Sequence, residues 1–526
     1  MRAGARRALA AAMALAVLGG PAGAATTSAT SRAAAAARDA RTWRRAHERA
    51  ILAEFARFLA LPNVASDRVG IERNADTLRA MLERRGLTVR VLRQEDAPPI
   101  VVADLAGPPD PPATGAPRTV AFYAHYDGQP TDTLSWRGLP WTPVLRSPSG
   151  QELRLGGSAS LDPESRLYAR SAGDDKAAIV AMLAALDAMR AAKRTPAFHL
   201  RLVFEGEEEA GSPHLAKYMA AEPALLRPDA WLICDGPVHQ SGRQLLAFGV
   251  RGTASVELTV YGPVKGLHDG HYGNWVPNPV SRLVHLLASL RDEQGEPTIP
   301  GFSDEVVAPT DAERAAIAAI PDVEDALRAE FEIGGTEGGG ARLNETLLKP
   351  AINFRGLKAG GVGERATNTI PTEARASIDF RLVPAQTPAS VRAHFEEHLA
   401  SLGWTVVASE PDSAARRTHD KLVRLEWGAG YPAARTPLDA PFSREVTALV
   451  SALGRTPVVT PTLGGSVPMY LFRQAGQARP GSPTPAINVP IANHDDNQHA
   501  PNENLRLQNL WDGIETFAAL FAGLEK

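Results

Sequence analysis

The segment TVAFYAHYDGQP, residues Thr119–Pro130, joins a short apolar run to a histidine and an aspartate, His125 and Asp127. The uncharged run predicts a buried strand, and the polar pair follows where the strand ends. A carboxylate two residues after a histidine can accept the second N–H of that histidine and fix its tautomer, as metal-binding histidines require. Taken alone, the pattern fits a polar strand end equally well.

The same pattern recurs along the chain. Buried strands are predicted at LRLVFE (200–205), DAWLIC (229–234) and PAINVPI (485–491), and the helical segment KAAIVAMLAALDAMRAAK (176–193) precedes them. This alternation predicts an α/β fold with a mostly parallel sheet. The carboxyl ends of parallel strands meet at one edge, where ligands bind. The candidate ligands that follow the strands are His125 and Asp127, then Glu207, Glu208 and Glu209, then Asp235, and finally His494 and His499.

Carboxylates are crowded at this predicted edge. Three consecutive glutamates in FEGEEEAGS, Glu207 to Glu209, are unfavourable neighbours unless a cation compensates their charge, although a solvated acidic turn is the alternative. Asp174 and Asp175 in SAGDDKA precede a helix, where a capping aspartate is expected in any case. Carboxylates and histidines at one edge together predict a two-metal site, with two zinc ions per subunit and manganese or cobalt as other candidates.

A second pattern interrupts the α/β domain. Strands at 255–262, 351–356, 374–384 and 404–409, with helices at 279–292 and 389–403, give the ferredoxin-like order β-α-β-β-α-β. Residues 301–348 are an additional Gly-rich excursion, expected as a long loop with a helix. The predicted organisation is a signal peptide at 1–24, a linker at 25–40, a catalytic domain at 41–250 and 416–526, and an inserted lid and dimerisation domain at 251–415.

Length and composition limit the classes of protein. A chain of 526 residues is long enough for at least two domains, and its net charge of 56 − 59 = −3 gives no basic excess for nucleic acid. The single cysteine, Cys234, excludes an intramolecular disulfide. The start MRAGARR, followed by ALAAAMALAVLGG, is typical of a secretory signal cleaved near Ala24 or Ala25, because the apolar run is shorter than the roughly 20 residues of a membrane span. We therefore expect an exported protein, periplasmic or secreted, without a membrane anchor after cleavage.

Nine motifs extend these inferences to a family. The segments HYDGQP, ARSAGDDKA, EGEEEAGS, CDG, LHDGHYG, NTIP, FRLVP, LGGSVP and HAPNE occur in this order from about Ile51 to the C-terminus. In this respect the chain resembles the zinc peptidase family that contains carnosinase-type dipeptidases, glutamate carboxypeptidase, aminoacylase and succinyl-diaminopimelate desuccinylase. DGQP followed by Trp136 and PWTP is most similar to the dipeptidase branch.

The resemblance implies a role for each motif residue of the catalytic domain. One zinc would be bound by His125 and Asp235, the other by Glu209 and His499, with Asp174 bridging the two. Asp127 would orient His125. Glu208 would be the general base that takes a proton from the attacking water and passes it to the leaving amine. His499 is preferred to His494 because it lies in the HAPNE motif.

The resemblance also implies functional residues in the inserted domain and after it. His268 in LHDGHYG would reach the active site of a partner subunit and stabilise the oxyanion, which implies a homodimer formed through the inserted domain. Arg381 in FRLVP would clamp a substrate carboxylate. Thr369, Gly465 and Ser466 match positions that contact the substrate.

The function implied is a di-zinc metallohydrolase that cleaves an amide bond next to a free C-terminal carboxylate, as a dipeptidase or carboxypeptidase does. Leu463 precedes GGS where an acidic residue is common, and this departure leaves an aminoacylase-like enzyme acting on N-acyl amino acids as an alternative. A catalytically silent binding homologue is a third alternative, against which the presence of Glu208 argues. The substrate would thus be a small peptide or an N-acyl amino acid.

Overall fold

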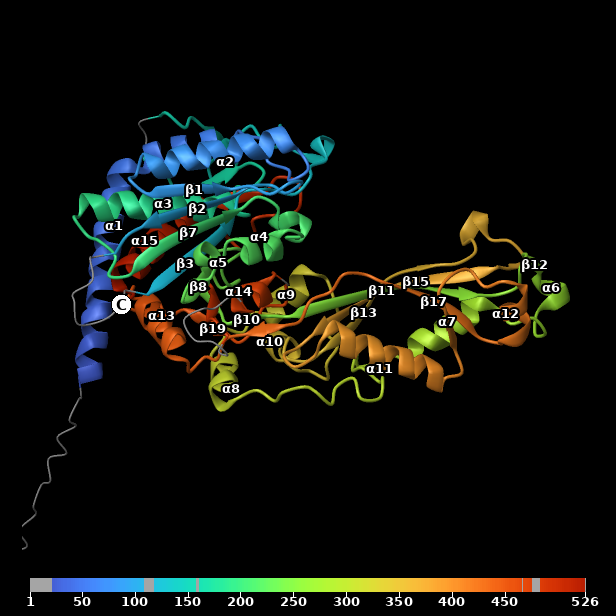
Figure 1. Cartoon of the computed structure of the whole chain (residues 1–526). Coiled ribbons are helices and arrows are strands. Elements are labelled where there is room, and N and C mark those ends of the chain that lie inside the picture. The colour runs from blue at the N-terminus through green and yellow to red at the C-terminus, as the bar shows by residue number, and fades with distance from the viewer. Residues whose placement is uncertain (1–20, 108–117, 158–159, 466, 475–482, 526) are drawn as a thin grey trace, which may run out of the picture.

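An eight-stranded sheet forms the centre of the larger part of the molecule (Figure 1). The computed structural model describes residues 21–107, 118–157, 160–465, 467–474 and 483–525. The strand order is β1-β2-β7-β3-β8-β20-β9-β19, and β7, β3, β8 and β20 are mutually parallel. The predicted mixed α/β fold with a mostly parallel sheet is therefore confirmed. The strands are β1 Thr88–Leu92, β2 Ile100–Leu105, β3 Thr119–His125, β7 His199–Glu205, β8 Ala230–Ile233, β9 Leu245–Ala247, β19 Val458–Thr460 and β20 Ala486–Asn488.

Helices cover both faces of this sheet, as expected where parallel strands are buried on two sides. Within β3, Val120 and Phe122 pack with the helices of one face, whereas Ala121 and Tyr123 pack with those of the other. The first face carries α1 Pro21–Leu59, α2 Arg68–Glu83, α3 Lys176–Ala191, α13 Pro441–Ser451 and α15 Leu507–Gly523. The second face carries α4 Leu215–Ala221, α5 Pro223–Leu226 and α14 Met469–Gln474.

A small four-stranded sheet lies beside this layer. Its strands are β4 Val144–Arg146, β5 Glu152–Leu153, β6 Arg166–Tyr168 and β21 Asn504–Arg506. Because β21 pairs with β6, the chain that follows the HAPNE motif is held beside the chain that leads to Asp174. Among the helices of the described residues, none combines the length and the apolar character needed to cross a bilayer.

The N-terminal segment differs from the prediction. Residues 25–40, expected as a mobile linker, lie within helix α1, and Ala29, Ala33, Ala36, Ala37 and Ala40 on that helix are buried. Helix α1 packs against α15, and Arg41 of α1 forms an ion pair of 2.6 Å with Glu515 of α15. An alanine-rich composition is compatible with a linker and with a close-packed helix face. These residues form a helix face because the C-terminal helix α15 packs against them. The predicted signal peptide, residues 1–24, lies mostly outside the described residues.

Overpacking at Ala33 tests this helical contact. Ala33 is fully buried, and a Cβ on Gly523 of α15 would lie 3.0 Å from the Ala33 Cβ. The Ala33→Leu substitution is therefore expected to lower the free energy of unfolding by about 1–3 kcal/mol in denaturant titrations. Ser31→Leu, at an exposed position of the same helix, is the control and is expected to change it by less than about 0.5 kcal/mol. If both substitutions changed the free energy of unfolding by the same small amount, the packing of α1 against α15 would be contradicted.

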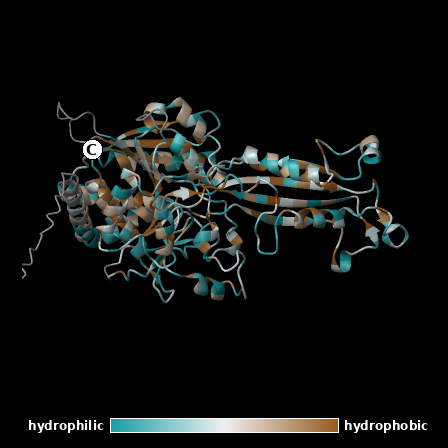
Figure 2. Ribbon diagram, turned by 90° about the horizontal axis from the view of Figure 1, so that it is seen from below, coloured by the Kyte–Doolittle hydropathy of each residue, from teal (hydrophilic) through white to brown (hydrophobic). Residues whose placement is uncertain are grey.

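The second part of the molecule is an elongated lid that extends away from the large sheet (Figure 2). Its five-stranded sheet has the order β13-β15-β11-β17-β16, and α7 and α11 cover one face. In β11, Ala254, Val256, Leu258 and Val260 are buried under these helices, whereas Glu257 on the opposite face is exposed. The elements are β11 Gly252–Tyr261, β13 Ala351–Lys358, β15 Glu373–Leu382, β16 Thr405–Val407, β17 Leu422–Trp427, α7 Pro279–Ala288, α11 Pro388–Ser401 and α12 Ser413–Thr418.

The lid sheet contains a strand that the prediction did not include. Strand β17 lies between β11 and β16, pairing antiparallel with the first and parallel with the second. The sheet therefore extends beyond the expected boundary at residue 415 and is wider than the ferredoxin-like order. The chain enters and leaves the lid through the paired strands β10 Gly249–Val250 and β18 Ala434–Arg435. Since β17 pairs with the first lid strand, about 165 residues earlier, its partner was not evident from local pattern.

Two further segments of the lid bear on function. The far tip holds β12 Leu267–His268 paired with β14 Thr369–Ile370, next to α6 Asp269–Tyr272 (Figure 1). The excursion of residues 301–348, expected as a loop with a helix, contains three short helices. They are α8 Asp311–Ala318, α9 Glu324–Glu330 and α10 Leu343–Thr346.

Candidate metal centre

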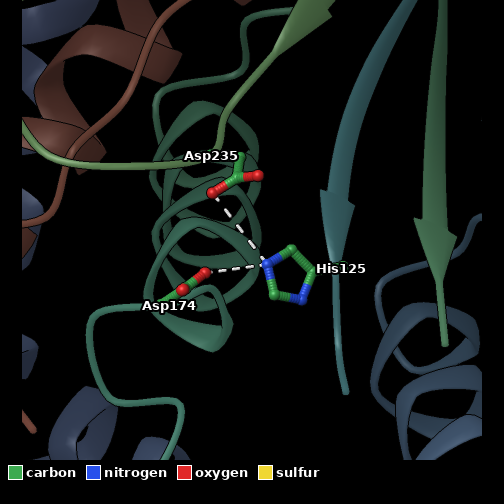
Figure 3. A group of neighbouring side chains, drawn as sticks. All are labelled: His125, Asp174 and Asp235. Atoms are coloured by element: carbon green, nitrogen blue, oxygen red, sulfur yellow. Dashed lines mark hydrogen bonds and ion pairs between the residues drawn. The ribbon is translucent and has the colours of Figure 1, made fainter. Parts of the chain in front are cut away.

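Three side chains from separate elements meet at the carboxyl edge of the large sheet (Figure 3). His125 ends β3, Asp235 follows β8, and Asp174 lies in the turn before α3. The His125 Nε2 atom lies 2.8 Å from Asp174 Oδ1 and 3.9 Å from Asp235 Oδ1. All three residues are buried, and each offers one atom to a common point, as a metal site requires.

A second group shares Asp174 with the first. The His499 Nε2 atom lies 3.1 Å from Asp174 Oδ2 and 3.0 Å from Glu209 Oε2. Glu209 lies in the 3₁₀ turn Glu208–Ala210 directly after β7. The two carboxylate oxygens of Asp174 thus contact different histidines, which is the geometry of a ligand that bridges two ions.

The charges of these residues fit bound cations. Burial favours the protonated form of Asp174, but hydrogen bonds from His125 and His499 outweigh it and keep the pKa of this carboxyl well below its usual range. Burial, followed by the charge of Asp174, raises the pKa of Asp235 to about 7. Hydrogen bonds to Asp174 and Glu209 raise the pKa of His499 to about 10. A dication bound at these groups would hold the carboxylates ionised, and imidazole with carboxylate is a donor set that suits zinc.

Asp127 connects the two groups. One of its oxygens lies 3.3 Å from His125 Nδ1, so that Nε2 is directed toward Asp174. The same carboxylate accepts the backbone N–H groups of Glu208 and Glu209, each at 3.1 Å. Asp127 therefore fixes both the ring of His125 and the turn that carries the two glutamates.

Glu208 lies beside the two groups of candidate metal ligands but belongs to neither of them. Burial first, and then the charge of Asp235, raises the pKa of the Glu208 carboxyl well above its ordinary value. Cations at the neighbouring groups would act in the opposite sense and favour the ionised form. A carboxylate in this position can accept a proton from a water molecule at the two groups of candidate metal ligands.

Glu503 and Asp175 are positioning residues whose roles the sequence did not indicate. The buried Glu503 carboxylate accepts the backbone N–H groups of Ser171, Gly173 and Asp174, each at 2.9 Å, and pairs with Arg170 at 2.8 Å. Asp175 makes no capping hydrogen bond. Its carboxylate instead accepts the backbone N–H of His125 at 3.2 Å. The final glutamate of HAPNE was the available signal for the first of these contacts.

The other predicted site residues, in the lid and after it, are not part of either group of candidate metal ligands within one chain. His268 and Thr369 are paired with each other at the far tip of the lid. Arg381 lies in β15, and its Nε–H donates to Asp379 at 2.7 Å. Gly465 lies in the turn after β19, and Ser466 lies outside the described residues. His494 is exposed and belongs to neither group.

The chain is similar to metallodipeptidases over most of its length. It is 25% identical to the Cys-Gly metallodipeptidase dug1 of Schizosaccharomyces pombe over 489 residues, covering 89% of this chain and 94% of the relative. It is 26% identical to the human Beta-Ala-His dipeptidase over 436 residues, covering 81% and 77%. The structure matches an M20 family metallo-carboxypeptidase, Sso-CP2 of Sulfolobus solfataricus, with a TM-score of 0.69, 26% identity, and coverage of 90% and 99%.

These findings contradict the expected export. The prediction of a periplasmic or secreted protein depended on a secretory signal at residues 1–24 that is cleaved near Ala24 or Ala25. Helix α1 instead continues from Pro21 through both positions to Leu59, and the chain is similar to dipeptidases that include the yeast Cys-Gly enzymes. The prediction of export is therefore wrong.

The family-level prediction, in contrast, is confirmed. Residues 121–522 match the sequence profile of peptidase family M20/M25/M40, which spans the metal groups, the lid and helix α15. The relatives and the solved structure with the same fold are metallopeptidases. The chain therefore belongs to peptidase family M20/M25/M40 and is a hydrolase of the metallopeptidase type.

Proposed function

We propose that this protein is a di-zinc dipeptidase or carboxypeptidase that hydrolyses an amide bond next to a free C-terminal carboxylate. The observation that carries the proposal is the position of Asp174, shared between two ligand groups with Glu208 beside them. In this assignment His125 and Asp235 hold one ion, Glu209 and His499 hold the other, and Asp174 bridges them. Zinc suits the donor set, since both groups combine one imidazole with two carboxylates.

The side chains divide the chemical work. Bound zinc would lower the pKa of water to about 7 and polarise the substrate carbonyl. Glu208 accepts the proton of the attacking water and returns it to the leaving amine, so that a single carboxyl serves as base and then as acid. Asp127 keeps the Nε2 atom of His125 directed at the site and holds the turn of Glu208 in place. Glu503 fixes the backbone on which Asp174 is carried.

Arg381 is proposed to bind the substrate carboxylate. It lies on β15 near the root of the lid, where its cross-strand neighbours are Thr253 on β11 and Ala351 on β13. A guanidinium group offers a planar pair of N–H donors to a carboxylate, and the Nε–H bond to Asp379 restricts its orientation. Substrates without a free carboxylate would not form this pair of charge-assisted hydrogen bonds.

Amidated substrates and an Arg381 variant test the proposal together. The zinc-loaded protein is expected to release amino acids from dipeptides in a coupled assay, and to act on their C-terminal amides at least about 100-fold more slowly, because a charge-assisted pair is lost. Arg381→Lys is expected to show the same loss on the free dipeptide, since lysine cannot reproduce the bidentate pair. Equal turnover of a dipeptide and its amide would contradict the carboxylate clamp. No turnover of any dipeptide would contradict the proposed function.

A homodimer formed through the lid is part of the proposal. Strand β13 is an edge strand of the lid sheet, and its outward residues Phe354 and Leu357 are 38% and 62% exposed. Val284 on the neighbouring helix α7 is 54% exposed. An unprotected edge strand with apolar side chains is a surface that a second copy can cover by strand pairing. This supports the lid as the dimerisation surface.

His268 is proposed to complete the active site of the partner subunit. The Nδ1 atom of His268 accepts the N–H of Gly270 at 3.1 Å, which leaves Nε2 as the N–H donor of the ring. A donor in this position suits an oxyanion. His268 is more than half exposed at the tip of the lid, and Thr369 lies opposite it on the paired strand, so both would act on the other subunit.

Mixed dimers test the action across the interface. His268→Ala is expected to lower kcat by about 100- to 1,000-fold with metal content unchanged, as loss of one oxyanion donor does. A mixture of His268→Ala with Glu208→Gln subunits is expected to regain activity, because one site of each mixed dimer combines an intact base with an intact histidine. Subunit exchange is verified with differently tagged chains. A mixture that exchanges but stays as inactive as its parents would show that His268 does not act in trans.

N-acyl amino acids are a second candidate substrate class. Leu463 packs its side chain against the apolar cluster of Val250, Met469 and Phe472, and its N–H donates to the Gly249 carbonyl at 2.8 Å. No carboxylate is therefore available at this position for the ammonium group of a dipeptide. An acylated amino group needs no such partner, which favours including N-acyl amino acids in the assay.

A further inference from the structure

The excursion of residues 301–348 forms one wall of a cavity of about 530 Å³ at the root of the lid. Four large apolar side chains of this excursion line the cavity, Leu327, Phe331, Ile333 and Leu343, and the last three are exposed. Phe331 is 59% exposed, Ile333 is 45% exposed and Leu343 is 40% exposed. Apolar side chains that gather in one hollow, where water covers them, indicate a binding surface more often than isolated exposed residues do.

The charged residues that line the same cavity contact each other. Arg342 pairs with Glu324 at 3.3 Å, and Lys349 pairs with Glu296. Asp322 accepts the N–H of Glu324 at 3.1 Å. Arg328 and Asp325 form a further ion pair in the wall, and Glu337 pairs with Arg291, so most of the lining charges are compensated within the protein. The surface that remains for a ligand is the apolar one.

The floor of the cavity adjoins the proposed carboxylate clamp. Arg251 and Ala351 line it, and Ala351 is the cross-strand neighbour of Arg381 in the lid sheet. Arg251 directly precedes β11, where Thr253 is the neighbour of Arg381 on its other side. Burial, and next the charge of Arg381, lowers the pKa of Arg251 to about 10, in agreement with this proximity.

The excursion that forms the cavity wall also contacts the turn after β19. The Leu347 Cδ2 atom, just beyond α10, lies 3.1 Å from the position of a Cβ on Gly464, in the turn that contains Gly465. The excursion that walls the cavity is therefore packed against the turn that carries Gly465, which matches a substrate-contacting position.

We propose that this cavity holds the side chain of the residue that bears the free carboxylate, and that it selects bulky apolar residues there. This inference rests on the proposed function. In an amino acid the side chain and the carboxylate leave the same carbon atom, so a carboxylate at Arg381 places that side chain in the adjoining space. The substrate class is then a dipeptide or an N-acyl amino acid ending in leucine, phenylalanine or a similar residue.

The test compares dipeptides that differ only in their last residue. The zinc-loaded protein is assayed on Ala-Gly, Ala-Leu, Ala-Phe, Ala-Asp and Ala-Lys. We expect kcat/KM for Ala-Leu and Ala-Phe to exceed that for Ala-Gly by about tenfold or more, because each apolar group of this size adds binding in a hydrophobic pocket. In Phe331→Ala and Ile333→Ser, the ratio of Ala-Leu to Ala-Gly is expected to fall by about tenfold.

Val307→Ala provides the matched control. Val307 is 56% exposed in the same excursion and does not line the cavity, so its substitution should leave the ratio unchanged. If dipeptides are cleaved without a preference for apolar residues, or if the ratio survives in both cavity variants, the pocket assignment is overturned and the proposed function stands. If no substrate of the panel is cleaved, including the acetylated forms of the same amino acids, both are overturned.

Discussion

Replacement of Asp174 by alanine is expected to remove both metals and to abolish activity. Each oxygen of this carboxylate contacts a different histidine, His125 at 2.8 Å and His499 at 3.1 Å, so its loss affects both ligand groups at once. Turnover should fall by more than about 10⁴-fold, because bound metal is what lowers the pKa of water to about 7. Elemental analysis after dialysis is expected to find less than one metal per subunit.

Two controls separate this effect from unfolding. Asp162→Ala removes an exposed aspartate from the part of the chain that leads to Asp174. This variant should retain both metals and full activity. The melting temperature of the apo form of Asp174→Ala should remain measurable by a cooperative transition, since Glu503 still binds the backbone of this turn. A variant that keeps two tightly bound metals would contradict the bridging assignment.

The second large effect is expected for Glu208→Gln. The amide retains the size of the side chain but cannot accept a proton, so kcat should fall by about 10²–10⁴-fold while both metals stay bound. Glu209→Gln is the matched comparison in the adjacent position. Since Glu209 Oε2 lies 3.0 Å from His499, this second variant should lose metal affinity first and regain activity at high zinc concentration. Steady-state kinetics and metal titration distinguish the two.

The opposite outcome would identify an error in the assignment of these neighbours. The backbone N–H groups of Glu208 and Glu209 both donate to Asp127, so the turn that carries the two side chains has a defined register. Loss of metal in Glu208→Gln together with metal retention in Glu209→Gln would exchange their roles. Zinc-dependent rescue is the decisive measurement, because a missing base is not replaced by more metal.

Local sequence was sufficient for the strands and for the edge where the candidate ligands meet. Apolar runs such as TVAFYA predict buried strands, and in a parallel sheet the residues after each strand reach the same edge whatever the details of packing. His125, Asp235 and the turn of Glu208 and Glu209 therefore lie near one another as expected. Which of these residues would bind which metal ion, in contrast, was inferred from the family resemblance.

Long-range packing decided what local pattern left open. The alanine-rich residues 25–40 form a buried helix because α15, at the far end of the chain, covers them, and β17 enters the lid sheet because β11 pairs with it. The same is true of the contacts of Glu503 with the turn before α3. These contacts join residues that are well over a hundred positions apart, and a local window contains only one of the two partners.

The sequence by itself determined the fold class, the family and the set of candidate ligands, since periodicity and motif chemistry are properties of neighbouring residues. Tertiary structure alone decided that Asp174 lies between two histidines, that His268 and Thr369 lie together at the tip of the lid, and that the excursion encloses a cavity beside Arg381. The physical reason is that each of these features depends on distances between segments, which are fixed only when burial of the apolar faces brings the whole chain together.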